Sequence, residues 1–83
     1  MRPLILMYDI VDDKARSKIA DACMDYGLDR IQYSCFAGHL SHNHAEALML
    51  DIEAILGKKA GNIQLISIAP KDWQNRLEVS NAG

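Results

Sequence analysis

The sequence predicts an α+β fold, a sandwich of the split βαβ type in which two helices cover one face of an antiparallel sheet. The first observation is the order of the segments, which runs strand, helix, extended region, helix, strand. The second is that a glycine follows each helical segment, as is common where helices end. The third is the length of 83 residues, enough for one small domain with a modest core.

The first predicted strand runs from about Pro3 to Ile10. Its residues are almost all apolar, which is typical of a strand in the interior of a sheet. Side chains alternate between the two faces of a strand, and here both faces are apolar until the acidic residue near the end. One face carries Leu4, Leu6 and Tyr8, and the other carries Ile5, Met7 and Asp9.

A helix that reaches Tyr26 is predicted next. Asp12 or Asp13 offers its N-cap, and Gly27 provides its C-terminal stop. Its apolar residues recur with a helical period, which identifies the buried stripe. These residues are Ala15, Ile19, Ala22, Cys23 and Tyr26.

Residues 28–40 have an alternating, extended pattern. Two arrangements remain open: one long bent strand, or two short strands broken near Ser34. Depending on the register, Arg30 lies toward the same end of the sheet as Asp9 or away from it. Phe36 shares a face with Ser34, and we expect it to pack on the side of the sheet that faces a second subunit.

A second helix, capped by Ser41 or Asn43, is predicted to run to Leu56 before Gly57. An apolar strand follows over residues 62–69. Residues 73–79 are expected to form a final edge strand. The single domain would therefore span residues 1–79, with 80–83 as a disordered tail.

The composition favours a cytoplasmic protein without a membrane segment. The apolar run after Arg2 is too short for a signal peptide or a bilayer-spanning helix. Cys23 and Cys35 lack metal-site spacing and are expected to be reduced thiols in the core. A formal net charge of -2 argues against a general basic coat for nucleic acid, although a local patch is compatible with it.

The predicted architecture leaves one apolar face of the sheet without helices. A soluble protein with such a face needs a partner to cover it. A second copy of the same chain is the simplest partner, and two-fold dimers are the commonest arrangement. We therefore expect a homodimer.

Asp9 is the first candidate functional residue, because a carboxylate at the end of an apolar strand is costly to bury unpartnered. It could cap the turn into the next helix, form an ion pair with Arg16, or bind a metal ion. Magnesium typically takes one or two carboxylates and several waters. A two-fold axis near Asp9 would supply the second carboxylate, so the dimer and the metal site form one hypothesis.

Several short motifs resemble the small CRISPR-associated adaptation protein family, the dimeric, metal-dependent nuclease partner of the CRISPR spacer integrase. The similarity runs from residue 1 to about residue 69. The motifs are Tyr8-Asp9-Ile10, Asp12-Asp13-Lys14-x-Arg16, Tyr26-Gly27, Arg30-Ile31-Gln32-Tyr33-Ser34-x-Phe36 and Gly38.

This resemblance implies a ferredoxin-like βαββαβ fold and one Mg²⁺ or Mn²⁺ shared between two Asp9 residues across the dimer. It implies catalytic roles for Asp9, Arg16 and Arg30, with the metal polarising a phosphoryl oxygen and an arginine stabilising the developing charge. It also implies that residues after Pro70 form a strand against the partner subunit. Three further residues are expected near the site: Tyr8, Ser34 and Phe36.

Three functions follow as hypotheses. The first is a CRISPR adaptation subunit that is also a metal-dependent endonuclease acting on single-stranded RNA or double-stranded DNA. The second is a non-catalytic scaffold for the spacer integrase. The third is a toxin-type endoribonuclease of the same fold.

Overall fold

The computed structural model describes residues 1–82 of the chain. It contains four strands and three helices within these residues. In chain order they are β1 (Arg2–Ile10), α1 (Asp13–Asp25), β2 (Asp29–Gln32), β3 (Cys35–Leu40), α2 (His42–Leu56), β4 (Gly61–Ser67) and α3 (Pro70–Gln74).

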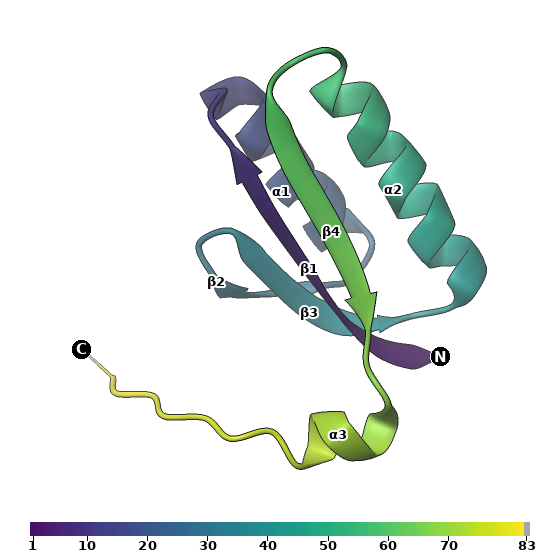
Figure 1. The fold of residues 1–83 in the computed structure, drawn as a ribbon, viewed down its shortest axis with the longest axis vertical. Coiled ribbons are helices and arrows are strands. Elements are labelled where there is room, and N and C mark those ends of the chain that lie inside the picture. Colours follow the sequence, from purple (N-terminus) through teal and green to yellow (C-terminus); the bar gives the residue numbers. More distant parts are fainter. Residues whose placement is uncertain (83) are drawn as a thin grey trace.

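The four strands form one antiparallel sheet in the order β2-β3-β1-β4. The helices α1 and α2 pack on the same face of this sheet, and the opposite face is left without them (Figure 1). This is the ferredoxin-like α+β sandwich, so the predicted fold class is confirmed. We call the face without α1 and α2 the open face; on β1 it carries Ile5, Met7 and Asp9.

The extended region forms two strands joined by a turn. The turn contains Tyr33 and Ser34, which is where the sequence allowed a break. The backbone N–H of Tyr8 donates to the carbonyl of Ser34 at 3.1 Å, and this bond attaches the turn to β1. The pairing of β2 with β3 is irregular between Arg30 and Gln32.

Side-chain caps and glycines set the helix ends as the sequence predicts. The Asp12 carboxylate accepts from the backbone N–H of Ala15 at 2.9 Å and caps α1. The Ser41 hydroxyl caps α2 by accepting from His44. Gly27 has a φ of 88° just beyond α1, a backbone conformation that favours glycine.

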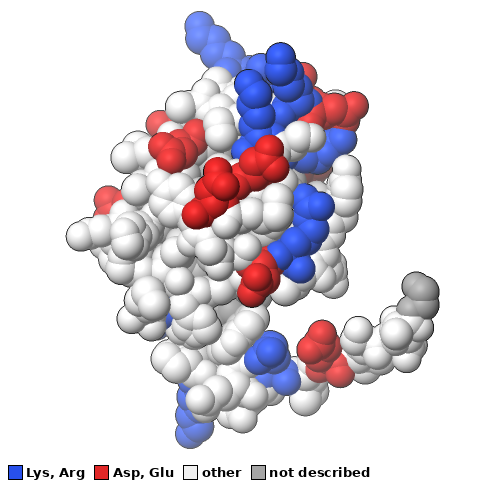
Figure 2. Space-filling view, turned by 180° about the vertical axis from the view of Figure 1, so that it is seen from behind, with Lys and Arg blue, Asp and Glu red and all other residues white. Residues whose placement is uncertain are grey.

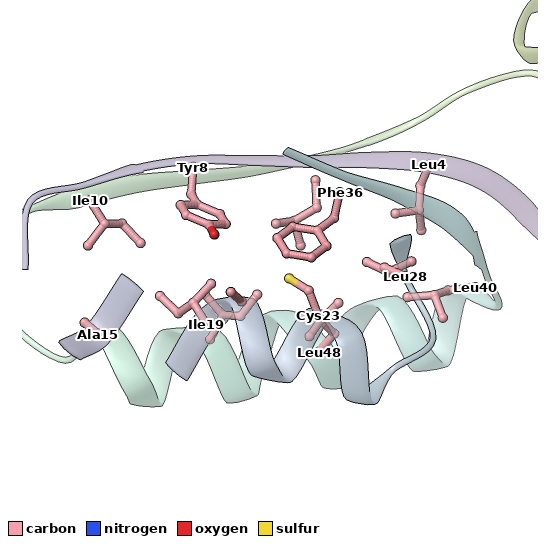
Figure 3. Packing of buried hydrophobic residues seen from close by; sticks show 13 residues of the cluster. Leu4, Tyr8, Ile10, Ala15, Ile19, Cys23, Leu28, Phe36, Leu40 and Leu48 are labelled. Atoms are coloured by element: carbon pink, nitrogen blue, oxygen red, sulfur yellow. The ribbon is translucent and has the colours of Figure 1, made fainter. Parts of the chain in front are cut away.

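The hydrophobic core lies between the sheet and the two long helices (Figure 3). Phe36 is completely buried there, opposite Leu6 in the sheet. The expectation that Phe36 packs on the open face is therefore wrong. Successive residues of β3 alternate between the two faces of the sheet, as predicted. Because Phe36 pairs with Leu6, however, Phe36 points toward the helices, and Cys35 and Ala37 point toward the open face.

The C-terminal part differs from the predicted edge strand. Residues 70–74 form the short helix α3, which begins at Pro70, a residue well suited to the first helical turn. Arg76 donates to the carbonyl of Trp73 and lies over its ring, which closes the end of this helix. The chain then leads away from the body (Figure 1), with Leu77 and Val79 almost fully exposed.

The division into a domain over 1–79 and a disordered tail over 80–83 stays a prediction, and Gly83 lies outside the described residues. Among residues 1–82, no helix combines the length and the apolar character needed to cross a membrane. Neither cysteine forms a disulfide: Cys23 is buried, whereas Cys35 is only partly buried.

Candidate metal and nucleic-acid site

Asp9 lies on the open face, near the carboxyl end of β1. It pairs with Asn62 of β4, and its side chain is exposed. Together with Met7, Tyr8, Asn62 and Gln64 it lines a shallow hollow of about 160 Å³. The amide of Gln64 donates to the side-chain oxygen of Asn62 at 3.0 Å, so two amides lie beside the carboxylate.

Arg16 reaches the end of β1 but does not pair with Asp9. One guanidinium nitrogen donates to the carbonyl of Ile10 at 3.0 Å, and another donates to the carboxylate of Asp13. The cap of α1 is Asp12. Both structural interpretations of Asp9, as a helix cap and as the ion-pair partner of Arg16, are therefore wrong for the described residues.

Arg30 is directly opposite Phe36 in the sheet, so the two side chains lie on the same face. Its guanidinium carbon is 5.1 Å from the Phe36 ring centroid and 5.8 Å from that of Tyr33. The register that the sequence left open thus brings Arg30 to the Tyr8 end of the sheet. We call Arg16, Arg30 and Tyr33 the arginine–tyrosine cluster.

Tyr8 joins this cluster to the core. Its ring stacks near Phe36, with centroids 6.3 Å apart, and its hydroxyl points toward the helices (Figure 3). That hydroxyl is buried and hydrogen bonds to no other group among residues 1–82. Burial raises the pKa of Tyr8, while the positive charge of Arg30 acts in the opposite direction. Tyr8 is therefore a neutral phenol at neutral pH.

The predicted site residues fall into two groups. Tyr8, Arg30 and Phe36 lie on the helix side of the sheet, and Arg16 projects from α1 toward them. Asp9 lies on the open face, because neighbouring residues of a strand point to opposite faces. Ser34 contributes its backbone carbonyl to β1. Both groups lie at the same end of the sheet, but one chain does not place its arginines beside its own Asp9 carboxylate.

The donors around Asp9 are of the kinds that a hard divalent cation prefers, but they are few in one chain. Mg²⁺ and Mn²⁺ prefer carboxylate, amide carbonyl and water oxygens, and this hollow offers the first two kinds. Among residues 1–82, however, no three His, Cys, Asp or Glu side chains come together as a metal site. A single subunit thus provides one carboxylate at this hollow.

Charge on the helical side is mixed and uneven. Figure 2 shows Lys and Arg side chains gathered toward the end of this face where α1 begins, with Asp and Glu side chains among them. Because acidic side chains lie among the basic ones, a local basic patch stays a prediction.

Three residues of these surroundings were not predicted as site residues. Asn62 and Gln64 come from β4 and reach Asp9 only through the strand register, which no local pattern specifies. Tyr33 lies inside the motif Arg30-Ile31-Gln32-Tyr33-Ser34-x-Phe36. The signal in the sequence that could have identified Tyr33 is an aromatic residue among the charged and polar residues of this motif.

Known proteins are similar to this chain over most of its length. The family model described as CRISPR associated protein Cas2 matches residues 1–76. A protein of Chloroflexus aurantiacus named CRISPR-associated endoribonuclease Cas2 2 is 47% identical over 72 residues, covering 87% of this chain and 85% of the relative.

Two solved structures share the fold. A hypothetical protein from Thermus thermophilus superposes with a TM-score of 0.80 at 28% identity, over 99% of this chain and 93% of that one. A chain of a partial Cas6-RT-Cas1–Cas2 complex gives a TM-score of 0.78 at 20% identity, over 95% of this chain and 91% of that one. Because the family model spans nearly all of the sequence and the Chloroflexus relative is so similar, this chain belongs to the CRISPR-associated Cas2 protein family.

Proposed function

We propose that the chain acts as a homodimer joined through the open face. Met7 of β1 and Ile66 of the edge strand β4 are 40% and 44% exposed on that face, although both are large apolar residues. Covering such a surface with a second copy removes it from water. Asp9 lies on the same face, so a two-fold axis through this region would bring two Asp9 carboxylates together.

The tail would complete this dimer. In the described part of the chain, the outer edge of β4 has no strand beside it, and a groove of about 940 Å³ runs between β4 and α2. Ile63, Leu65 and Met49 are among its apolar lining residues. The exposed Leu77 and Val79 supply apolar side chains two residues apart, the spacing of one face of a strand. The partner's tail would thus bind in this groove as an added strand.

The metal site would be formed by Asp9 from each subunit, with Asn62 and Gln64 nearby. A bound Mg²⁺ or Mn²⁺ supplies positive charge that polarises a phosphoryl oxygen and lowers the pKa of a water. Arg16 and Arg30 would bind phosphates of the same nucleic acid around the end of β1. No carboxylate or histidine of residues 1–82 stands beside Asp9 as a general base, so we expect slow turnover.

The proposed activity is metal-dependent endonucleolytic cleavage of RNA. The observation that carries it is an exposed carboxylate in a hollow of the open face, at the same end of the sheet as two guanidiniums. The name of the Chloroflexus relative, an endoribonuclease, supports RNA over double-stranded DNA as the substrate. The family match also favours this function over a toxin-type endoribonuclease.

The test compares Asp9→Asn with Asp21→Asn, a matched change at an exposed aspartate of α1. Cleavage of a labelled single-stranded RNA is followed with Mn²⁺, with Mg²⁺ and with chelator. We expect Asp9→Asn to lower the rate at least about 100-fold, because it removes both carboxylates of the shared site. Asp21→Asn should cleave at the wild-type rate. Equal cleavage by both variants, or cleavage in chelator, would show that Asp9 holds no catalytic metal.

A second function, a scaffold for the spacer integrase, is favoured by one comparison. One chain of the solved partial Cas6-RT-Cas1–Cas2 complex shares this fold, and that complex includes Cas1 by its name. A scaffold needs a rigid dimer and backbone contacts but no cleavage. If Asp9→Asn abolishes RNA cleavage but supports spacer acquisition at the wild-type frequency in cells, the scaffold is the role that acquisition uses. Loss of acquisition with an intact dimer would contradict a metal-free scaffold.

A further inference from the structure

The exposed ring of Tyr33 contacts two cations that come from different elements. Its centroid is 5.7 Å from the guanidinium carbon of Arg16, on α1, and 5.8 Å from that of Arg30, on β2. Both distances are within the range of a cation–π interaction. Tyr33 itself is 68% exposed at the turn between β2 and β3, so core packing does not explain a large aromatic residue at this position.

The ring offsets an unfavourable arrangement. Two guanidiniums drawn to one place repel each other. Arg16 has a partial counter-charge in the Asp13 carboxylate, whereas Arg30 forms no ion pair among residues 1–82. The electron-rich face of an aromatic ring attracts both. Each arginine also has contacts of its own: Arg16 donates to the carbonyl of Ile10 and to the carboxylate of Asp13, and Arg30 lies over Phe36. Tyr33 is the side chain shared by the two.

We propose that Tyr33 is a positioning residue that holds Arg16 and Arg30 together as one binding site for the phosphate backbone of single-stranded RNA. This inference rests on the proposed function and adds that cleavage and substrate binding depend on different residues. Asp9 serves the reaction on the open face, while Tyr33 serves substrate binding through the two arginines. Loss of Tyr33 should therefore raise KM and leave kcat nearly unchanged.

The first experiment measures binding without cleavage. Anisotropy of a fluorescent mixed-sequence single-stranded RNA is titrated in chelator with the wild type, Tyr33→Phe, Tyr33→Leu and the control Ile31→Ala, which alters an exposed neighbour in β2. Phenylalanine retains the ring, so we expect its Kd within about twofold of the wild type. Leucine removes two cation–π contacts and should weaken binding about fivefold to tenfold. Ile31→Ala should bind as the wild type does.

A double-mutant cycle separates positioning from direct contact. In the Arg30→Gln background, Tyr33→Leu should raise the Kd for RNA much less than it does in the wild-type background. The reason is that one of the two cations that Tyr33 holds is already absent. An RNA of the same length with abasic sites should show the same loss as the intact RNA. If the loss disappears with the abasic RNA, the ring stacks on a base and the positioning role is overturned.

Failure of this inference and failure of the proposed function give different results. If wild type and Tyr33→Leu bind and cleave RNA equally while Asp9→Asn does not cleave, the role of Tyr33 is wrong and the proposed function stands. If Tyr33→Leu lowers kcat instead of raising KM, the role is likewise wrong. If the wild type neither binds nor cleaves RNA, both are overturned. Circular dichroism of each variant confirms that the fold is unchanged.

Discussion

At the scale of single residues, the alternation of one strand decides how the site is divided. Tyr8 and Asp9 are adjacent in the sequence, yet Tyr8 points into the helix-covered core and Asp9 points onto the open face. The arginines belong with Tyr8, because Arg30 is paired opposite the buried Phe36. The proposed phosphate-binding site and the proposed metal site would therefore lie on different faces of the same sheet end.

Burial at this sheet end also gives the protein a dependence on alkaline pH. Cys23 is fully buried beside the core face of the sheet, and burial raises the pKa of its thiol from about 9 to about 11. The fold therefore favours the neutral thiol. Its stabilising contribution is complete below pH 9 and is lost as the pH rises toward 11, because the unfolded chain releases this proton first.

We expect Cys23→Ala to make the free energy of unfolding less sensitive to pH in this window. The wild type should lose about 2–3 kcal/mol more than the variant between pH 9 and pH 11. Urea unfolding at fixed protein concentration measures this, and Cys35→Ala, at a partly buried thiol, is the matched control. Parallel pH profiles for wild type and Cys23→Ala would contradict the assignment.

At the scale of elements, helix α1 carries Arg16 to the end of β1, so its first turn matters to the site. Asp12 caps it, and the backbone N–H of Arg16 also donates to the Asp12 carbonyl at 3.0 Å. The loop between β1 and α1 is therefore short, and two hydrogen bonds to Asp12 fix its helix end. Arg16 is positioned by a local motif that the sequence makes visible.

Removal of this cap should destabilise the protein without removing any core contact. Asp12→Ala leaves the N–H of Ala15 without its acceptor, and we expect the free energy of unfolding to fall by about 1 kcal/mol. Asp12→Ser, which keeps a capping oxygen, should recover most of this loss. Urea denaturation of the wild type, Asp12→Ala and Asp12→Ser measures both effects. If the alanine and serine variants are equally unstable, Asp12 does not stabilise the protein by capping α1.

Local signals of this kind are what the sequence makes predictable. The caps, the glycine stops and the apolar period of α1 and α2 each depend on a few neighbouring residues, and they predict both long helices closely. The face of Phe36 does not follow from such signals. It depends on pairing with Leu6, thirty residues away, and on the irregular register of β2.

The C-terminal helix and the surroundings of Asp9 were missed for related reasons. Trp73 and the apolar residues after it alternate well enough for a strand, but Pro70 starts a helical turn that the pattern overlooked. Asn62 and Gln64 contact the Asp9 hollow only because β4 pairs with β1 in one register. Strand pairing over a long sequence separation is not encoded in any short window.

At the scale of the whole molecule, the features left unexplained in one chain all point to a second one. The open face exposes Met7 and Ile66. Within residues 1–82, no strand lies beside the free edge of β4, and the tail carries two apolar residues, Leu77 and Val79, that are almost fully exposed. The Asp9 hollow contains one carboxylate where a divalent cation is better held by two. The proposed two-fold dimer would account for all four.

The number of metal ions bound per chain tests this account most directly. Calorimetric titration of the purified protein with Mn²⁺, alongside its molar mass from light scattering, should give one ion for every two chains and a dimeric mass. Asp9→Asn should remain dimeric and bind no ion, whereas Asp21→Asn should behave as the wild type does. One ion per chain, binding by a monomer, or unchanged binding in Asp9→Asn would contradict a site shared between two Asp9 carboxylates.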